Sequence, residues 1–250
     1  MNLQLISCLC ITRAKPDLLK RAINCFLGQT YTNKELVIVY EDDDIETEDF
    51  VKSITDESIS TVKVDSTPKL TLGALRNLAI NICEGEYFCQ WDDDDWFHKD
   101  RLAMQMRAIC ESQKGGCVMT NWIMHDELRS KTYFSVLRLW EGSIMCKTSL
   151  VRGQIKYPEI RKGEDTEFTK KLIELKYIFP LMMPCMYIYV FHGRNTWDHL
   201  HMVNNFYNNS QLLSPGANLV VKNILKETYT YDKASQLLLD SVLKEIDYLH

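Results

Sequence analysis

The sequence lacks the features that mark several large classes of protein. It has no surplus of basic residues, and its net charge of −5 argues against nucleic-acid binding through a broad basic face. It has no long hydrophobic run, because the longest apolar stretch, 177–191, contains two prolines and is shorter than the roughly 20 residues of a membrane-spanning helix. It also lacks low-complexity segments and internal repeats. The composition of the sequence, 46% hydrophobic and 25% charged residues, is typical of a globular domain.

The cysteines lack the pattern of a disulfide scaffold. There are nine, an odd number, no two are spaced as Cys-x-x-Cys, and most lie within apolar runs. This pattern is typical of buried, reduced thiols. The first residues also lack the basic start and small-residue cleavage site of a signal peptide. We therefore expect a cytoplasmic protein, soluble or peripheral to a membrane.

Strand and helix patterns alternate along the first 91 residues. Short apolar runs predict four buried strands, at 5–11, 36–40, 60–64 and 86–91. Apolar residues at helical spacing predict helices between them, at 16–27, 46–54 and 72–82. This order predicts an α/β fold with right-handed crossovers and a mostly parallel, Rossmann-like sheet flanked by helices.

The rest of the chain predicts a β-rich middle, a helix after Gly163 and, from about residue 200, an Asn-rich segment with two amphipathic helices. We expect a catalytic domain at 1–200 and a small C-terminal helical extension at 201–250. Nothing in the extension indicates chemistry. We expect it to pack on the domain or on a partner, and its helices offer a contact for a homodimer.

Polar residues follow three of the predicted strands at the point where each ends. Thr12 and Arg13 follow the first strand, Glu41–Asp44 the second and Asp92–Asp95 the fourth. Ligands of open α/β sheets bind beyond the carboxyl ends of the strands. These side chains are therefore expected at one rim.

The four consecutive aspartates need a source of positive charge or water. In extended chain, Asp92 and Asp94 share one face, and Asp93 and Asp95 share the other. A carboxylate pair at this spacing suits Mg²⁺ or Mn²⁺, which leave positions for substrate phosphates. Asp-x-Asp is also frequent by chance, and a solvated acidic turn in which Asp95 caps the next helix explains the pair alone equally well.

Four motifs, in order, resemble glycosyltransferase family 2, the inverting nucleotide-sugar enzymes with a Rossmann-like GT-A domain. ISCLCITRAKPDLLKRAINCFLGQTYTNKELVIV resembles the opening strand, helix and Gln-Thr-Tyr-x-Asn-x-Glu turn of that family. LGALRNLAI resembles its Ala-Arg-Asn helix, EYFCQWDDDDW its acidic strand end, and KGEDTEF its Glu-Asp helix start. The resemblance covers about residues 4–195, and four ordered motifs are more specific than any one of them.

The resemblance implies a role for each matching residue. Thr12 would hold the nucleotide base, Asp92 would face the ribose or sugar, and Asp94 would bind the metal. Asp165, preceded by Glu164, would be the catalytic base. On the residues alone, Asp165 could instead stabilise the first turn of a helix, where acidic side chains are favoured by the helix dipole.

Other candidates match less closely. His192 in YVFHGRN corresponds to a metal or diphosphate ligand, but a half-buried structural histidine explains it equally well. The family's second strand ends Val-Asp-Asp-Gly-Ser, whereas this one continues into Glu41 and Asp42, so either could contact the base. The other donor-site candidates are Arg13, Arg76 and Asp93. Trp96 and Trp122 are core candidates first and acceptor contacts second.

The resemblance thus implies an inverting, metal-dependent glycosyltransferase that uses Mn²⁺ or Mg²⁺. Its donor would be a nucleotide-sugar, most commonly a UDP-sugar in this family, carrying a hexose or N-acetylhexosamine. Its acceptor would be a hydroxyl of a free, lipid-linked or protein-linked glycan or of another molecule. A sugar nucleotidyltransferase is an alternative, but ITRAKP has no glycine for a phosphate loop. A non-catalytic nucleotide-sugar or metal-binding module is a second alternative.

Overall fold

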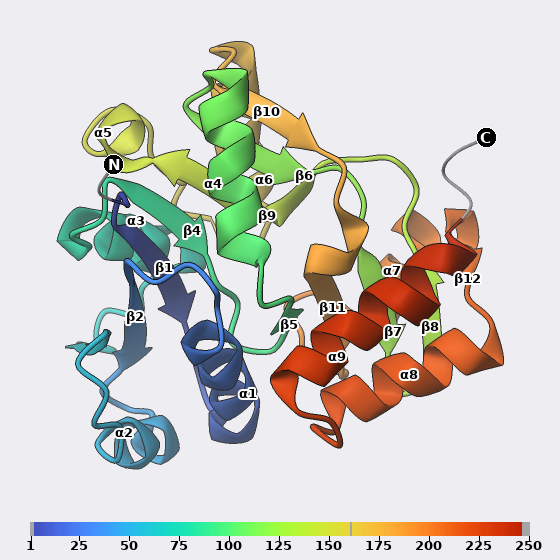
Figure 1. Ribbon diagram of the computed structural model, residues 1–250. Coiled ribbons are helices and arrows are strands. Elements are labelled where there is room, and N and C mark those ends of the chain that lie inside the picture. The colour runs from blue at the N-terminus through green and yellow to red at the C-terminus, as the bar shows by residue number, and fades with distance from the viewer. Residues whose placement is uncertain (1–2, 161, 247–250) are drawn as a thin grey trace.

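The computed structural model describes residues 3–160 and 162–246, which are organised around two sheets (Figure 1). The larger sheet has seven strands, in the order β10 (Ile178–Leu181), β6 (Gly116–Met119), β9 (Trp140–Lys147), β4 (Tyr87–Gln90), β1 (Ile6–Ile11), β2 (Lys34–Glu41) and β3 (Ile59–Val64). All neighbours are parallel except β9, which runs antiparallel to both β4 and β6. The α/β fold with a mostly parallel sheet is therefore confirmed.

The smaller sheet has five strands. Their order is β12 (Gln211–Leu212), β8 (Lys131–Phe134), β7 (Ile123–Asp126), β11 (Tyr187–Phe191) and β5 (Trp96–Phe97). Only β7 and β11 are parallel. Sequence patterns predict strands in this region, but not that they form a sheet of their own.

The helices are α1 (Pro16–Leu27), α2 (Ile45–Val51), α3 (Leu72–Ile82), α4 (Arg101–Ser112), α5 (Thr148–Val151), α6 (Glu164–Glu174), α7 (His199–Asn205), α8 (Pro215–Leu225) and α9 (Tyr231–Leu237). Local signals explain several starts. Pro16 opens α1, Asp44 accepts from the backbone N–H of Thr47 in α2, and Thr71 accepts from that of Ala74 in α3.

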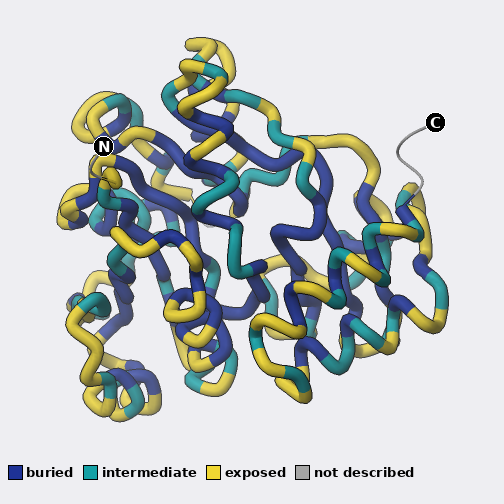
Figure 2. Tube along the Cα trace, in the orientation of Figure 1, coloured by how far each residue is buried: buried dark blue, intermediate teal, exposed yellow. Residues whose placement is uncertain are grey.

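Most strand residues are buried, and exposed residues gather at the turns and on outer helix faces (Figure 2). All nine cysteines are free, and every one except Cys110 is buried, as their apolar surroundings predict. Within residues 3–160 and 162–246, no helix is long and apolar enough to cross a bilayer.

The C-terminal helices pack on the rest of the protein. α8 and the continuation of α9, a π turn at Leu238–Val242, lie side by side (Figure 1). The Tyr231 hydroxyl lies 3.0 Å from the carbonyl oxygen of Cys25 and 2.6 Å from that of Phe97. The proposed boundary at 200 falls inside α7, so this helix belongs to both of the predicted units. The last predicted residues, 247–250, lie outside the described part of the chain.

A buried polar chain ties α8 to the smaller sheet. Asn218 donates from Nδ2 to the carbonyl of Ser130, so its Oδ1 accepts from the Thr132 hydroxyl at 2.8 Å. The Thr132 oxygen is then the acceptor for Nδ1 of His125, 2.9 Å away. His125 is thus fixed as the neutral tautomer with a proton on Nδ1.

Candidate active site

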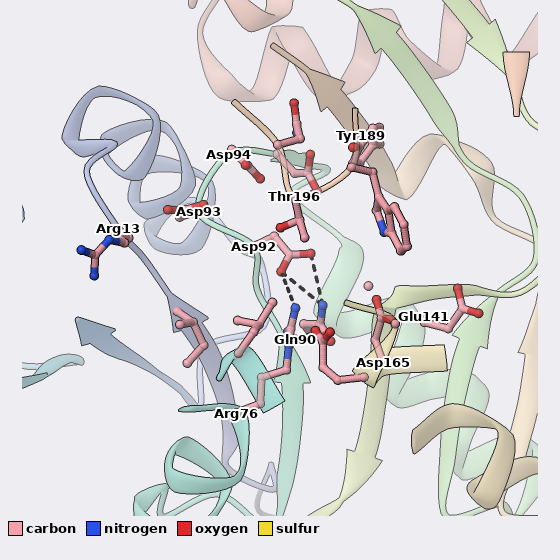
Figure 3. A pocket seen from close by; sticks show the side chains of 18 of the residues that line it. Arg13, Arg76, Gln90, Asp92, Asp93, Asp94, Glu141, Asp165, Tyr189 and Thr196 are labelled. Carbon is pink, nitrogen blue, oxygen red and sulfur yellow. Dashed lines mark hydrogen bonds and ion pairs between the residues drawn. The ribbon is translucent and has the colours of Figure 1, made fainter. Parts of the chain in front are cut away.

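A cavity of about 520 Å³ lies at the carboxyl ends of β1, β2 and β4. The pairing of these strands brings their ends together, since Leu9 lies opposite Val37 on one side and Gln90 on the other. The start of β9, the start of α6 and residues 194–206 complete the walls. Figure 3 shows Arg13 on one side of this space and Glu141 on the other. The strand exits predicted to meet at one rim do meet there.

Lys15 supplies positive charge to the aspartates. Its Nζ lies 2.7 Å from both Oδ1 of Asp93 and Oδ2 of Asp94, and Thr12 donates to Oδ2 of Asp93 at 2.7 Å. Burial raises the pKa of Asp93 to about 6, although Lys15 opposes this shift. Burial also acts to raise the pKa of Asp94, but hydrogen bonds from His192 and Lys15 outweigh it and lower that pKa. Part of the positive charge that the aspartates need is therefore supplied by this chain itself.

Asp92 belongs to a second charge network. Gln90 donates to it at 3.2 Å, and Nη2 of Arg76 lies 3.5 Å from the same oxygen, as Figure 3 shows. The Tyr187 hydroxyl oxygen, which donates its proton to Asp95, lies 3.3 Å from the other oxygen of Asp92. Burial raises the pKa of Asp92, while Arg76 lowers it.

Asp95 has a structural role that differs from the expected cap. It is 1% exposed and accepts hydrogen bonds from the Tyr187 hydroxyl and, at 2.8 Å, from the backbone N–H of Val190. The helix that follows begins at Arg101 with Asp100 at its N-cap. The alternative of a solvated acidic turn capped by Asp95 is therefore wrong, because Asp93 and Asp95 are buried and bonded to neighbouring elements.

Arg76 connects the aspartates to the Glu-Asp helix. Its Nε donates to Oε1 of the buried Glu164 at 3.2 Å. The neighbouring Asn77 exchanges two hydrogen bonds, of 2.8 and 2.9 Å, with the backbone of Tyr157. Tyr157 stacks on Phe168 of α6 at 3.9 Å. The Ala-Arg-Asn motif thus holds α6 against α3.

Asp165 lines the cavity at the start of α6 and accepts a hydrogen bond from the Thr166 backbone N–H at 2.8 Å. The N-cap of α6 is Gly163, with φ of +78°, a conformation that favours glycine. Glu164 forms an ion pair with Arg76, and burial raises the pKa of Glu164. Of the two acids, Asp165 has the freer carboxylate.

The second strand contributes Glu41 to the cavity. Glu41 is the last residue of β2 and lies 2.5 Å from Arg13 and 2.7 Å from Lys69. Asp42 is exposed, accepts from the Ser66 backbone N–H and does not line the cavity. Of the two candidates, Glu41 lines the cavity and Asp42 does not, because the strand ends one residue before Asp42.

The two tryptophans proposed as acceptor contacts lie elsewhere. Trp96 is 3% and Trp122 0% exposed, and neither lines the cavity. That prediction is wrong, because both side chains point into the core. Trp140 lines the cavity instead and stacks on Trp122 from outside, with ring centroids 4.5 Å apart.

Several lining residues were missed from the sequence: Lys15, Lys69, Arg138, Trp140, Glu141, Gly142 and Tyr189. Of these residues, only Lys15 could have been predicted from the sequence, because it follows the first strand together with Thr12 and Arg13. Gly142 marks a close approach: a Cβ there would lie 3.1 Å from Oδ2 of Asp92 and 3.2 Å from Nε1 of Trp140.

Asp94 and His192 are the residues best placed to hold a metal ion. Nε2 of His192 lies 3.1 Å from Oδ2 of Asp94, and Oδ1 of Asp94 has no hydrogen-bond partner among residues 3–160 and 162–246. In the same ranges, no three His, Cys, Asp or Glu side chains form a metal site by themselves. A carboxylate and an imidazole fit a divalent ion whose coordination substrate phosphates and water complete.

Solved structures similar to this one bind nucleotide-sugars. Staphylococcus aureus TarS, residues 1–349, in complex with UDP-GlcNAc, matches with a TM-score of 0.63 and 17% identity over 98% of this chain and 73% of that chain. The mannosyltransferase PcManGT from Pyrobaculum calidifontis, in complex with GDP-Man and Mn²⁺, matches with a TM-score of 0.61 and 13% identity over 96% of this chain and 71% of that one. At these identities, the likeness shows a shared GT-A fold.

Sequence relatives cover shorter segments. Amylovoran biosynthesis glycosyltransferase AmsB of Erwinia amylovora is 30% identical over 90 residues, 35% of this chain and 30% of that protein. Putative colanic acid biosynthesis glycosyl transferase WcaA of Escherichia coli K12 is 34% identical over 108 residues, 41% of this chain and 37% of that protein. The matches thus span about a third of each relative. The profile described as Glycosyl transferase family 2 matches residues 7–152, more than half of the sequence, and the chain belongs to this family of nucleotide-sugar-dependent glycosyltransferases.

Proposed function

We propose that the protein is an inverting glycosyltransferase that moves a sugar from a nucleotide-sugar to a hydroxyl of a glycan acceptor. The observation that carries the proposal is that one cavity holds two separate acidic centres, Asp92–Asp94 and Asp165. Inverting transfer requires both, because the diphosphate leaves with negative charge while the attacking hydroxyl loses a proton.

In this proposal, Asp165 accepts the proton of the acceptor hydroxyl. Its neighbour Glu164 is less suited, because it is buried and paired with Arg76. Positioned general bases contribute about 10²–10⁴-fold to the rate. Arg76, bonded to both Glu164 and Asp92, keeps α6 at a fixed position relative to the donor.

Asp92 and Thr12 would contact the sugar and the nucleotide, and Glu41 with Arg13 would contact the base. Asp94 and His192 would hold Mn²⁺ or Mg²⁺, which, when bound, would stabilise the charge on the leaving diphosphate. The Mn²⁺ in the PcManGT complex supports this choice. The two structural neighbours bind UDP-GlcNAc and GDP-Man, so UDP and GDP are the first nucleotides to test, with a UDP-sugar our first candidate.

The names of the curated relatives support a glycan acceptor, since one acts in amylovoran and the other in colanic acid biosynthesis. Membership of the family argues against a sugar nucleotidyltransferase. The presence of Asp165 in the cavity argues against a non-catalytic module. The division at residue 200, a homodimer through the C-terminal helices and a cytoplasmic location stay predictions.

The test is thermal stabilisation by a panel of nucleoside diphosphates with and without Mn²⁺. We expect one nucleotide to raise the melting temperature in the presence of Mn²⁺, and Asp94→Asn to remove the metal-dependent part. Asp49→Asn, a change of the same kind in an exposed residue that does not line the cavity, should keep it. If no nucleotide stabilises the protein under either condition, the proposal fails.

A further inference from the structure

The basic side chains of the cavity fall into two groups. Four of its arginines and lysines form ion pairs with carboxylates: Arg13, Lys15, Lys69 and Arg76. The other two, Arg138 and Arg194, form no ion pair with any residue in 3–160 or 162–246. A cavity that neutralises most of its own cations therefore leaves two free to meet a ligand.

The two free arginines lie in different places. Arg194 follows Gly193, and its backbone N–H donates to Nδ1 of His192, so it lies near the proposed diphosphate site. Arg138 precedes β9, and its guanidinium lies over the ring of Phe206, 4.7 Å from the centroid. This cation–π contact orients the guanidinium without neutralising it.

Arg138 belongs to the side of the cavity where an acceptor would meet the base. Arg138 lies two residues before β9, whose first residues line the cavity, and β9 packs against α6, the helix that begins with Glu164 and Asp165. Glu141 forms no ion pair with Arg138 among the described residues. Arg138 thus lines the same cavity as Asp165 without being part of the acidic centre.

The wall around Arg138 combines aromatic surface with further positive charge. Trp140 packs edge to face against Tyr189 at 5.2 Å and against Phe206 at 6.4 Å, and all three line the cavity. Lys162 lies 4.9 Å above the ring of Trp197, also a lining residue. Like Arg138, Lys162 has no ion pair within the described ranges. Apolar walls with a few placed polar groups are typical of sites that bind a ring and fix its orientation.

We propose that Arg138 binds an acidic group, a carboxylate or a phosphate, carried by the glycan acceptor. The proposal rests on the proposed function, because it assumes that the acceptor enters beside Asp165. A guanidinium pairs with planar and tetrahedral oxyanions through two parallel hydrogen bonds, which also fix the orientation of the partner. The donor would then bind on the side of the cavity where the cations are paired with carboxylates. The side that carries Arg138 would select an anionic acceptor.

Three probes that differ only at C6 test this inference: phenyl β-glucoside, phenyl β-glucuronide and phenyl β-glucoside 6-phosphate. Their dissociation constants are measured by calorimetry with Mn²⁺ and a saturating concentration of the nucleoside diphosphate that stabilises the protein most. The nucleotide fills the diphosphate site, so an acidic probe cannot bind there instead. We expect at least one acidic probe to bind roughly fivefold to tenfold more tightly than the neutral one. The acidic probe that is favoured tells whether the group is a carboxylate or a phosphate.

Arg138→Gln should remove this preference, and Arg107→Gln should keep it, because Arg107 lies on the outer face of α4, paired with Glu111. Stabilisation by the nucleotide shows that each variant is folded, and it also separates the two proposals, since it does not involve the acceptor. A protein that binds the nucleotide but does not distinguish the probes, whether all bind or none does, would overturn this inference alone. A preference that survives in Arg138→Gln would do the same.

Discussion

The two sides of the cavity are built on opposite principles. On the side of β1, β2, β4 and α3, the basic side chains are bonded to carboxylates, and the charges form a closed network. On the side of β9 and α7, the wall is largely aromatic and Arg138 is unpaired. A network of fixed charges is preorganised for one reaction, whereas an open aromatic wall can change its ligand with few substitutions. We infer that the paired side holds the donor and that the aromatic side determines the choice of acceptor.

The largest expected effect is that of Asp165→Asn, which removes the base and leaves the paired network intact. We expect transfer to fall about 10²–10⁴-fold while donor binding is unchanged. Initial rates and nucleotide-induced thermal shifts measure the two quantities separately. Glu167→Gln, an exposed residue in the same turn of α6, is the control. Undiminished transfer by Asp165→Asn would assign the base to another residue.

Arg76→Gln tests whether the paired side is held together by its charges. It leaves Glu164 and Asp92 without their common partner, and breaking a buried ion pair in this way costs about 3–5 kcal/mol. Urea denaturation should show this loss in the free energy of unfolding. The double variant Arg76→Gln/Glu164→Gln should regain part of it, because a buried charge is removed. Arg107→Gln, from an exposed pair, should change the free energy by less than about 1 kcal/mol.

The sequence was sufficient for the strand ends of the paired side, although Lys15 and Lys69 were missed there, and it was not sufficient for the aromatic side. The paired side comes from strand ends, and alternating strand and helix patterns place Thr12, Glu41 and Asp92 at one rim. The aromatic side depends on which tryptophan faces the cavity. Trp122 and Trp140 lie in similar apolar surroundings in the sequence. Only the packing of the two sheets places Trp122 in the core and Trp140 in the wall of the cavity. The contact of Arg76 with Glu164, 88 positions away, is likewise set by helix packing.

Low pH should destabilise the smaller sheet, which lies behind the aromatic side, through protonation of His125. Burial lowers the pKa of His125 to about 4 in the folded protein, against about 6.5 when unfolded. Between these values the unfolded chain binds a proton that the folded protein does not, so stability falls as the pH drops from about 6.5 to 4. The loss through this residue reaches about 3 kcal/mol. His125→Asn keeps a donor for Thr132 and should show a correspondingly smaller loss between pH 7 and 4. Equal losses in both proteins would contradict this account.

Gly142 lies where the two sides meet, and Gly142→Ala should have the smallest effect. The added Cβ would press on Asp92 and Trp140 at once, from 3.1 and 3.2 Å. Crowding of this kind costs about 1–3 kcal/mol of stability, so we expect a melting temperature lower by a few degrees together with a lower kcat/KM. Gly216→Ala, whose Cβ would be 3.5 Å from its nearest neighbour, is the matched control. Unchanged kinetics in Gly142→Ala would show that the two sides are independent.

The hydroxyl of Tyr231 has a consequence for how the chain folds. The hydroxyl oxygen lies within hydrogen-bond distance of the carbonyl oxygens of Cys25 and Phe97. The ring of Tyr231 covers Gly28, where a Cβ would lie 2.2 Å from the ring. During synthesis, the end of the first helix therefore stays uncovered until the ribosome has released residue 231. The packing of α1 thus depends on a contact made about 200 residues further along the chain, so its C-terminal end stays exposed until α9 has been synthesised.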